Sequence, residues 1–526
     1  MRIILAQKNF IVGDVNHNIE LIKQSALDNP NADLIVFSEL CICGYPPEDL
    51  LLKQAFINEC MNAVEELARH TENTPALLIG SPYMENNTLY NAAFLLDGGR
   101  IHTKQYKHIL PNYSVFDEKR WFTAGELPEI IEFKGKKIGL FICEDMWDEA
   151  IYPHFKEANI LLSINASPYD LDKHERRHDQ VNTALHGQSK PIYYVNQIGG
   201  QDGLVFDGGS FIFDGEEYIS EPLFWREGYV SIDTTISNEN KTPHHHIYNA
   251  LVLGLKDYMG KNGFAKALIG LSGGIDSVLT AAIAVDALGS ENVKTVMMPS
   301  RYTSQESLDD ARETAQLLGV EHKEIDIEPA YKIMLETLSS EFVDEKTEIT
   351  EENLQARIRG VLLMAMSNKF NSLLLATGNK SELAVGYCTL YGDMCGGYAV
   401  LGDVYKTDVF RLSHFRNENH CEHWLGENGR VIPENAITKA PTAELNDNQK
   451  DTDSLPEYDV LDSILTQLIE QQKSPQEVEG FDTALVEKIA KMLYRTEYKR
   501  RQAPPITKIT TMQFNKERRY PITNGS

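Results

Sequence analysis

The sequence predicts an α/β protein in two parts, an α/β sandwich followed by a doubly wound parallel sheet. In both halves, short apolar runs of strand length alternate with longer stretches that have the apolar spacing of helices. The regular alternation of strands and helices in the second half implies right-handed crossovers and therefore a parallel sheet. The chain has 526 residues, of which 42% are hydrophobic, so each half is long enough to bury a sizeable core.

The overall charge argues against two classes of partner. Lys and Arg number 50 against 77 Asp and Glu, which gives a formal net charge of −27. A chain this acidic repels DNA and anionic membranes, so we expect neither a nucleic acid nor a membrane as partner. The seven cysteines do not predict a disulfide framework, and the chain has no uninterrupted apolar run of about 18 residues. We therefore expect a cytoplasmic protein.

The apolar pattern of the first half predicts strands and helices in alternation. Residues 2–7 and 32–37 are predicted as strands, and residues 18–27 and 49–69 as helices. Further strands are predicted at 76–80, 92–96, 138–143, 160–164 and 191–195. Residues 237–247 then lack apolar periodicity, and we predict that they form a linker between domains at 1–236 and 248–526.

After the linker the alternation restarts. The predicted helices are 248–259, 277–288, 308–318 and 354–370, and the predicted strands are 267–271, 293–298, 322–327 and 373–377. Residues 433–458 are polar and predict a long loop. This loop either orders over a ligand or is an ordinary solvated loop.

Three chemically active side chains follow predicted strands in the first half: Glu39, Lys107 and Cys143. A free cysteine after an apolar strand is more often a buried small hydrophobic residue, so Cys143 alone is weak evidence for a site. The three groups together could meet at one edge of the sheet. Glu39 could then take the thiol proton, Lys107 could stabilise an oxyanion, and Cys143 could form a thioester with an amide carbon.

These three segments, in this order and spacing, resemble the nitrilase/amidase superfamily. The resemblance implies an α-β-β-α sandwich with Glu39 as general base, Lys107 as the catalytic lysine and Cys143 as the nucleophile. It implies that Glu118 is a second, orienting carboxylate. It also implies that glutamine is bound by Tyr113, Ser167 and Lys173, the last at a position where some relatives carry Arg.

A glycine-rich turn between a predicted strand and a predicted helix indicates a second site. It consists of Gly270, Leu271, Ser272, Gly273, Gly274, Ile275, Asp276 and Ser277. Glycines let backbone N–H groups approach an anion closely, and the following helix directs its positive end at a phosphate. The turn is not a Walker A loop, because it lacks the Gly-Lys-Ser/Thr ending.

The pattern Ser-Gly-Gly-x-Asp-Ser after such a strand resembles the ATP pyrophosphatases, which cleave ATP to AMP and pyrophosphate. This resemblance implies ATP as co-substrate and Asp276 as a Mg²⁺ ligand, because pyrophosphate must be neutralised without a loop lysine. Residues 375–393 narrow the resemblance to the NAD⁺ synthetases. That family implies that Thr377 contacts ATP, that Glu382 binds the metal or the dinucleotide, and that the deamido-NAD⁺ pocket includes Asn353, Tyr387, Leu390 and Lys499.

Positive charge for this second site is expected from Lys380 and from the basic run at 498–502, although a solvated surface is the alternative for such a run. Both motif sets occur in the order found in the glutamine-dependent NAD⁺ synthetase family, which the chain resembles over nearly its whole length. The resemblance implies that the first domain hydrolyses glutamine and that the second amidates deamido-NAD⁺ to NAD⁺, releasing glutamate, AMP and pyrophosphate. It also implies a homo-oligomer with a protected route for ammonia.

Three alternatives stay open at this point. The same two domains could serve a different acceptor, the first domain could be a catalytically inactive scaffold, or both sites could be idle in a protein that only assembles. The intact triad and residues 377–393 argue against all three.

Overall fold

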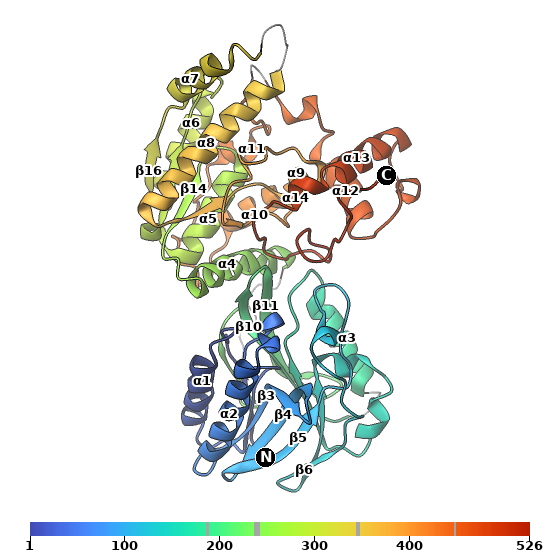
Figure 1. Ribbon diagram of the computed structural model, residues 1–526. Helices are drawn as coiled ribbons and strands as arrows, with labels where there is room; N and C mark the ends of the chain where they lie inside the picture. Colours follow the sequence, from blue (N-terminus) through green and yellow to red (C-terminus); the bar gives the residue numbers. More distant parts are fainter. Residues whose placement is uncertain (186–188, 236–241, 343–347, 447–448, 526) are drawn as a thin grey trace. The chain divides into compact units, whose positions relative to one another are not determined.

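The computed structural model describes residues 1–185, 189–235, 242–342, 348–446 and 449–525. The chain divides into two compact units, unit 1 (Met1–Asn240) and unit 2 (Lys241–Ser526) (Figure 1). Among the helices of the described ranges, none is long and apolar enough to cross a membrane.

Unit 1 contains two β-sheets. The first has the strand order β13-β1-β2-β3-β4-β5, and the second has the order β10-β11-β9-β8-β7-β6, with β12 paired to β11. The strands are β1 (Ile3–Gln7), β2 (Leu34–Val36), β3 (Ala76–Glu85), β4 (Thr88–Asp97), β5 (Arg100–Tyr106), β6 (Ile131–Phe133), β7 (Lys136–Ile142), β8 (Ile160–Asn165), β9 (Ile192–Asn196), β10 (Ile198–Gln201), β11 (Leu204–Phe213), β12 (Tyr218–Phe224) and β13 (Gly228–Val230).

Side chains that alternate along the strands build the layers of unit 1. In β1, Ile3 and Leu5 belong to a core cluster that also contains residues of β7, β8 and β9, so this cluster lies between the two sheets. Ile4 and Ala6 belong to a second cluster, which packs the first sheet against its helices. The helices of unit 1 are α1 (Val15–Asp28), α2 (Gln54–His70) and α3 (Lys173–Leu185), and α3 packs on the second sheet. The α-β-β-α sandwich is therefore confirmed.

The helix predicted at residues 49–69 consists of two elements. The 3₁₀ turn η1 (Glu48–Leu52) precedes α2, and Lys53 between them is extended, with φ −94° and ψ 110°. The apolar residues of η1 continue the helical spacing across this break, so periodicity alone does not detect it. Helix α3 and strands β10 to β13 have no counterpart among the predicted elements.

Unit 2 is built on a parallel sheet with the order β16-β15-β14-β17-β18. Its strands are β14 (Ala267–Gly270), β15 (Val293–Met297), β16 (Glu321–Glu324), β17 (Leu373–Ala376) and β18 (Tyr398–Ala399). Strands β15 and β16 extend the sheet to one side of β14, and β17 and β18 extend it to the other. Open parallel sheets bind ligands beyond the carboxyl ends of the strands where the order reverses in this way. The doubly wound parallel sheet is confirmed, and β14 and β17 border its reversal point.

Most helices of unit 2 lie around this sheet, and those of the last part of the chain lie to one side of it (Figure 1). They are α4 (Pro243–Lys261), α5 (Ile275–Leu288), α6 (Gln305–Leu318), α7 (Glu328–Leu338), α8 (Glu348–Phe370), α9 (Lys380–Val385), α10 (Lys406–Glu418), α11 (Glu434–Thr438), α12 (Tyr458–Ile469), α13 (Thr483–Arg495) and α14 (Glu497–Arg500). Helix α7, helices α9 to α14 and strand β18 have no counterpart among the predicted elements. Of these, α12 and α13 share a separate apolar cluster with α9.

The end of the predicted linker is helical. Residues 237–241 lie outside the described ranges, but α4 already begins at Pro243. The side chain of Thr242 accepts a hydrogen bond from the backbone of His245, and Pro243 occupies the first helical position. These start signals hold the first turn in a helix although its side chains show no apolar periodicity, and His245 is buried.

Candidate active sites

Glu39, Lys107 and Cys143 lie just beyond the carboxyl ends of three strands of unit 1. Glu39 follows β2, Lys107 follows β5, and Cys143 follows β7. Cys143 opens the short 3₁₀ turn η3 (Cys143–Trp147) with a φ of 50°, a conformation that is strained for a side chain other than glycine. All three side chains are buried, and the structure brings them together in the interior of unit 1.

Lys107 joins two carboxylates. Its Nζ donates to Glu39 Oε1 at 2.6 Å and to Glu118 Oε1 at 2.9 Å, and the hydroxyl of Tyr45 donates to Glu118 Oε1 at 3.0 Å. Burial alone would lower the pKa of Lys107, but the charges of Glu118 and Glu39 outweigh it and raise that pKa well above its ordinary value. Burial raises the pKa of Glu118 to about 7, with Lys107 opposing the shift and Glu39 adding to it. Lys107 therefore stays charged.

The thiol of Cys143 is protonated in the resting site. Burial raises its pKa well above the ordinary value, Glu39 adds to the shift, and Lys107 opposes it. A neutral thiol is a weak nucleophile, so attack on a substrate requires a base that takes the proton. Glu39 is a buried carboxylate of the same cluster.

Two of the three residues predicted to bind glutamine contact the turn η3. The hydroxyl of Tyr113 donates to Glu144 Oε1 at 2.7 Å, and 56% of the Tyr113 residue surface is exposed. The Nζ of Lys173, the first residue of α3, lies 5.6 Å from the centroid of the Trp147 ring. Because Glu144 and Trp147 belong to the turn that Cys143 opens, both predicted residues lie on the side of unit 1 that carries the thiol.

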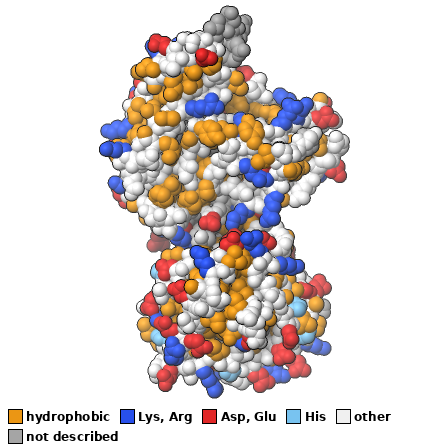
Figure 2. Space-filling view, in the orientation of Figure 1, with side chains coloured by type: hydrophobic (Ala, Val, Ile, Leu, Met, Phe, Trp, Pro, Cys, Tyr) orange, Lys and Arg blue, Asp and Glu red, His pale blue; other side chains and the backbone are white. Residues whose placement is uncertain are grey.

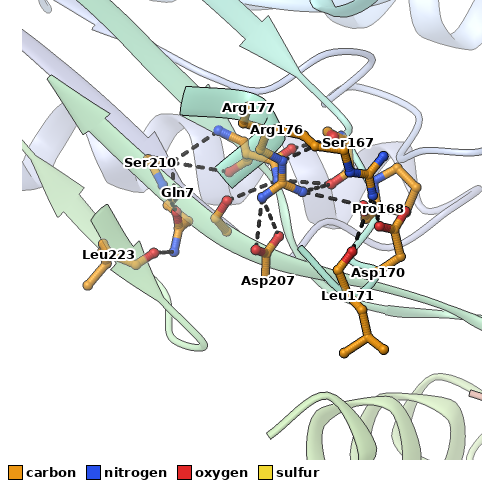
Figure 3. A network of polar contacts seen from close by, with 12 residues as sticks. Gln7, Ser167, Pro168, Asp170, Leu171, Arg176, Arg177, Asp207, Ser210 and Leu223 are labelled. Atoms are coloured by element: carbon orange, nitrogen blue, oxygen red, sulfur yellow. Dashed lines mark hydrogen bonds and ion pairs between the residues drawn. The ribbon is translucent and has the colours of Figure 1, made fainter. Parts of the chain in front are cut away.

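Ser167, the third of these residues, is held by a buried ion pair (Figure 3). Arg177 Nε donates to Ser167 Oγ at 3.2 Å, and Arg177 Nη2 donates to the Ser167 carbonyl oxygen at 2.7 Å. Arg177 Nη1 lies 2.8 Å from each carboxylate oxygen of Asp207. Neither partner was predicted, because residues 173–185 are too polar for their helix to be recognised and Asp207 lies in an unpredicted strand.

The glycine-rich turn of unit 2 follows β14 and leads into α5. Two serines make hydrogen bonds within the turn. Ser277 Oγ donates to the carbonyl oxygen of Gly274 at 2.9 Å, and Ser272 N donates to Ser277 Oγ at 3.1 Å. Gly273 has a φ of 79°, and a Cβ at this position would lie 2.2 Å from the carbonyl oxygen of Ser307. Gly274 caps α5, so the turn ends at a helix N-terminus, which favours a bound anion.

A cavity of about 300 Å³ lies beside this turn. Its lining includes most of the turn residues, Thr377 after β17, and Glu382 and Tyr387 of the α9 region. Because the turn follows β14 and Thr377 follows β17, the cavity lies where the strand order reverses, as ligand sites of open parallel sheets do.

Asp276 and Glu382 face one ammonium group in this cavity. Lys406 Nζ forms an ion pair with Asp276 and lies 3.3 Å from Glu382 Oε1, while Asn379 Nδ2 donates to Asp276 Oδ1 at 2.8 Å. Burial raises the pKa of Glu382 to about 8, with Lys406 opposing the shift and Asp276 adding to it. Two carboxylates around one cation form a donor set that suits Mg²⁺ when nucleotide phosphates supply further ligands. Lys406 was not predicted, because no motif identified it.

No group of three or more His, Cys, Asp or Glu side chains in the described ranges could hold a metal ion by itself. A divalent cation at Asp276 and Glu382 would therefore depend on oxygen atoms of a bound nucleotide or of water. Mg²⁺ commonly binds proteins in this way, with one or two carboxylates and the phosphates of a substrate.

Arg359 of α8 adds positive charge to the wall of the cavity. Its Nε donates to the carbonyl oxygen of Met298 at 3.0 Å, and within the described part of the chain no carboxylate forms an ion pair with it. Burial lowers the pKa of Arg359 to about 10, although Glu444 and Asp393 oppose the shift. A guanidinium group without a paired carboxylate in a cavity is suited to bind an anionic ligand. Arg359 was predicted only as part of the helix at 354–370.

Three of the residues predicted for the dinucleotide pocket do not line the cavity. Asn353 Oδ1 accepts a hydrogen bond from Thr389 Oγ1 at 2.8 Å, and the carbonyl oxygen of Leu390 accepts one from Arg357 Nε at 3.3 Å. Neither Asn353 nor Leu390 is among the lining residues, and the same is true of Lys499.

The basic residues expected to supply positive charge serve the structure instead. Lys499 Nζ donates to the carbonyl oxygens of Gly386 at 2.8 Å and Cys388 at 2.7 Å, and so supports the segment after α9. Lys380 is fully buried, and its Nζ lies 2.8 Å from Asp403. The expectation that Lys380 supplies charge to a ligand is therefore wrong, because a lysine buried this deeply requires a paired carboxylate.

Part of the predicted loop at 433–458 lines the cavity. This stretch contains α11 and the 3₁₀ turn η6 (Asp451–Asp453), and its residues 447–448 lie outside the described ranges. Lys439 Nζ donates to Ser307 Oγ at 3.0 Å, and Glu444 accepts hydrogen bonds from Ser307 Oγ and Ser304 Oγ, each at 2.7 Å. These contacts bind residues 439–445 to the start of α6, at the edge of the cavity.

The chain matches two protein families in series. The carbon-nitrogen hydrolase family matches residues 5–236, and the NAD synthase family matches residues 247–503. The glutamine-dependent NAD(+) synthetases of Xanthomonas campestris pv. campestris and Acinetobacter baylyi are each 44% identical to the chain, over its whole length and 98% of their own.

Solved structures show the same full-length similarity. The glutamine-dependent NAD⁺ synthetase of Acinetobacter baumannii, solved in complex with adenosine diphosphate, is 39% identical and has a TM-score of 0.79, covering all of this chain and 98% of its own. The enzyme of Cytophaga hutchinsonii has a TM-score of 0.85 at 22% identity, with the same coverage, and shares the fold.

Proposed function

This chain belongs to the glutamine-dependent NAD(+) synthetases, and we propose that its two sites divide the reaction of that family between them. The protein amidates deamido-NAD⁺ to NAD⁺ at the expense of ATP, takes the nitrogen from glutamine, and releases glutamate, AMP and pyrophosphate. We assign the hydrolysis of glutamine to the site of unit 1 and the use of ATP to the cavity of unit 2.

In unit 1, Glu39 takes the proton of Cys143 as the sulfur attacks the carboxamide carbon of glutamine. Lys107 uses two of its three N–H donors on Glu39 and Glu118, and its third donor stabilises the oxyanion. The proton then passes from Glu39 to the leaving nitrogen, ammonia departs, and a thioester remains on Cys143. Water that Glu39 deprotonates attacks the thioester and gives glutamate.

Tyr113, Ser167 and Lys173 hold the polar end of glutamine in this proposal. Tyr113 and Lys173 contact the turn η3, and Ser167 presents a hydroxyl group that Arg177 holds in place. A lysine at position 173 supplies the positive charge that a substrate carboxylate requires.

In unit 2, the turn at 270–277 and Thr377 bind the phosphates of ATP. The nicotinate carboxylate of deamido-NAD⁺ attacks the α-phosphorus, pyrophosphate leaves, and ammonia displaces AMP from the activated acyl group. Adenylation is required because hydroxide is a poor leaving group. The ADP bound by the A. baumannii relative supports a nucleotide site in this family.

Charged side chains around the cavity have distinct tasks in this step. Asp276 and Glu382 would hold Mg²⁺, which when bound neutralises charge on the phosphates. Lys406 and Arg359 supply further positive charge, and Arg359 contacts an anionic group of one of the two nucleotides. Tyr387, Asn353, Leu390 and Lys499 form and support the dinucleotide pocket, the last three through the segment at 386–390.

The buried cluster of Glu39, Lys107 and Cys143 carries this assignment, because such a cluster has no purpose in a scaffold. The test is NAD⁺ formation from deamido-NAD⁺, ATP and Mg²⁺, with glutamine or ammonium as nitrogen source, in the wild type and in Cys143→Ala. We expect the variant to lose the glutamine-driven reaction and to keep the ammonium-driven one. A variant that still uses glutamine would refute the role of Cys143.

We also propose that the protein forms a homo-oligomer through unit 2. Large hydrophobic residues are exposed on α7 and α8, among them Ile333 (63% exposed), Val361 (64%) and Met364 (38%). Figure 2 shows hydrophobic side chains gathered on the face over which α8 runs. An exposed apolar face on a strongly acidic chain is best covered by a second copy of the same chain.

We place the protein in the cytoplasm, and the absence of disulfides in the described residues supports this location.

A further inference from the structure

Asn91 contacts both Glu39 and Lys107, although no step of the reaction uses it. It lies on β4, and its side chain Nδ2 donates to Glu39 Oε1 at 2.8 Å. Its backbone carbonyl oxygen accepts a hydrogen bond from Lys107 N at 2.8 Å, so the pairing of β4 with β5 continues to the catalytic lysine. The residue is 1% exposed.

The hydrogen bonds of Glu39 distinguish its two oxygen atoms. Oε1 accepts from Lys107 Nζ at 2.6 Å and from Asn91 Nδ2 at 2.8 Å, whereas among the described residues Oε2 accepts only from the backbone N–H of Ala166 at 3.2 Å. That N–H also interacts with the thiol of Cys143. The oxygen that shares a neighbour with the thiol is therefore Oε2, and Oε1 already holds two donors.

The orientation of the Asn91 amide follows from its surroundings. Its Nδ2 must face the carboxylate, because the carbonyl oxygen Oδ1 would repel it. Oδ1 is enclosed and has no hydrogen-bond partner in the described structure. A buried acceptor without a partner destabilises a fold, so an apolar side chain of the same shape would suit the packing better.

A neutral donor also suits the charge of the site. Glu39 interacts electrostatically with Lys107, Cys143 and Tyr45. Glu118 is joined to it through the ammonium group of Lys107. An amide adds a hydrogen bond to Glu39 without adding charge to a site that already holds one lysine and two carboxylates. It restrains the carboxylate and leaves the balance of charges unchanged.

We propose that Asn91 is a positioning residue for the general base, which saturates Oε1 of Glu39 and so makes Oε2 the atom that takes the proton of Cys143. This proposal rests on the assignment of glutamine hydrolysis to unit 1. It goes beyond that assignment because it selects the reacting oxygen and explains a buried acceptor that has no partner.

The test is Asn91→Leu, a substitution of nearly equal shape that removes both the donor and the unpartnered oxygen. We expect kcat/KM for glutamate release from glutamine to fall roughly ten-fold or more, the effect of losing one hydrogen bond to a charged group. The acid limb of the pH profile of kcat/KM should move to higher pH, because a carboxylate that loses a donor is protonated more readily. NAD⁺ formation from ammonium should be unchanged, and the melting temperature should not fall.

Thr71→Val is the matched control, because it removes a buried hydroxyl that donates to the carbonyl oxygen of Ala68 at 2.7 Å, at the end of α2. This variant should form NAD⁺ from glutamine and from ammonium as the wild type does. An Asn91→Leu variant with normal glutamine use, or one whose acid limb does not move, would overturn the proposal. A parallel loss with both nitrogen sources would show a general effect on the fold and overturn it too. Glu39→Gln separates the premise from the proposal: full glutamine use in that variant refutes Glu39 as the base, whatever Asn91 does.

Discussion

At the scale of single residues, the buried pair of Arg177 and Asp207 holds Ser167, the residue that we propose binds glutamine. The planar guanidinium group of Arg177 donates to both carboxylate oxygens of Asp207. It also donates to the hydroxyl and to the carbonyl oxygen of Ser167. A lysine has one nitrogen and cannot make this set of contacts.

Arg177→Lys therefore keeps the charge but releases Ser167. We expect the KM for glutamine to rise about ten-fold, since a hydrogen bond involving a charged group is worth roughly 1.5–3 kcal/mol, while the KM for ammonium stays unchanged. Steady-state assays with each nitrogen source measure both quantities. An unchanged KM for glutamine would contradict the role given to Ser167.

Asp145 gives unit 1 a pH-dependent stability. It accepts hydrogen bonds from the backbone N–H groups of Ile109 at 2.8 Å, His108 at 3.0 Å and Ile142 at 3.3 Å, and burial raises its pKa to about 7 from an ordinary 3.8. The folded state thus holds this proton more tightly than the unfolded state. The stabilisation is complete below about pH 4 and is lost as the pH rises through about 7.

Asp145→Asn should remove this dependence. The free energy of unfolding of the wild type, measured relative to the variant, should fall between pH 5 and pH 7 with a slope of up to about 1.4 kcal/mol per pH unit. Urea unfolding of both proteins at several pH values measures the slope. Parallel curves would show that Asp145 does not carry the proton.

The predictability of the site differs from residue to residue. Glu39 and Cys143 could be recognised because each follows a strand with a clear apolar pattern. Asn91 could not, because its partner Glu39 lies 52 residues away in the sequence and a lone asparagine in a strand carries no local signal. Lys406 could not be recognised for the same reason, since its partner Asp276 lies 130 residues away in the sequence.

At the scale of elements, the turn between β14 and α5 depends on the approach of α6. Gly273 lies against the carbonyl oxygen of Ser307, and Ser307 in turn binds Lys439 and Glu444. The turn, the start of α6 and residues 439–445 are therefore joined at a single point beside the cavity.

Gly273→Ala should push these elements apart. We expect the KM for ATP to rise ten-fold or more and NAD⁺ formation to fall with both nitrogen sources, while glutamine hydrolysis in unit 1 continues. Gly263→Ala is the matched control, because Gly263 has a similar φ of 76° but no atom within 4 Å of the added Cβ. Equal effects of the two substitutions would assign the loss to backbone strain rather than to the close approach.

Elements with strong periodicity were predicted, and those defined by other signals were not. Strands β14, β15 and β17 of the parallel sheet follow the apolar pattern closely, whereas β16 is polar and the two-residue strand β18 was not predicted. The start of α4 depends on a capping threonine and a proline, and α3 is too polar to show an apolar face. The short strands at the edge of the second sheet of unit 1 pair through their backbones and leave little trace in the sequence.

At the scale of the whole molecule, the net charge of −27 does not show where the cations of unit 2 lie. Lys406, Lys439 and Arg359 line one cavity, together with five carboxylates: Asp276, Glu382, Asp393, Glu444 and Asp451. Composition argues against nucleic acids as partners, but it could not locate this cavity, because three positive charges hardly change the net charge.

The apolar face of α8 gives a prediction about assembly. Val361→Glu places a charge at the centre of the proposed contact and should shift the protein to a smaller species. Size-exclusion chromatography with light scattering measures the mass. Leu27→Glu is the control, since Leu27 on α1 is exposed to a similar extent, 59% against 64% for Val361, and should leave the mass unchanged. A Val361→Glu variant with the wild-type mass would contradict an interface at α8.

The protonated thiol of Cys143 protects the protein between turnovers. Oxidants and electrophiles react with thiolates. Because burial raises the pKa of the Cys143 thiol well above its ordinary value, almost no thiolate is present for them to attack. In the proposed mechanism, the sulfur becomes reactive only when glutamine occupies the site and Glu39 takes the proton. The burial of Cys143 would then limit its oxidation while the site is empty.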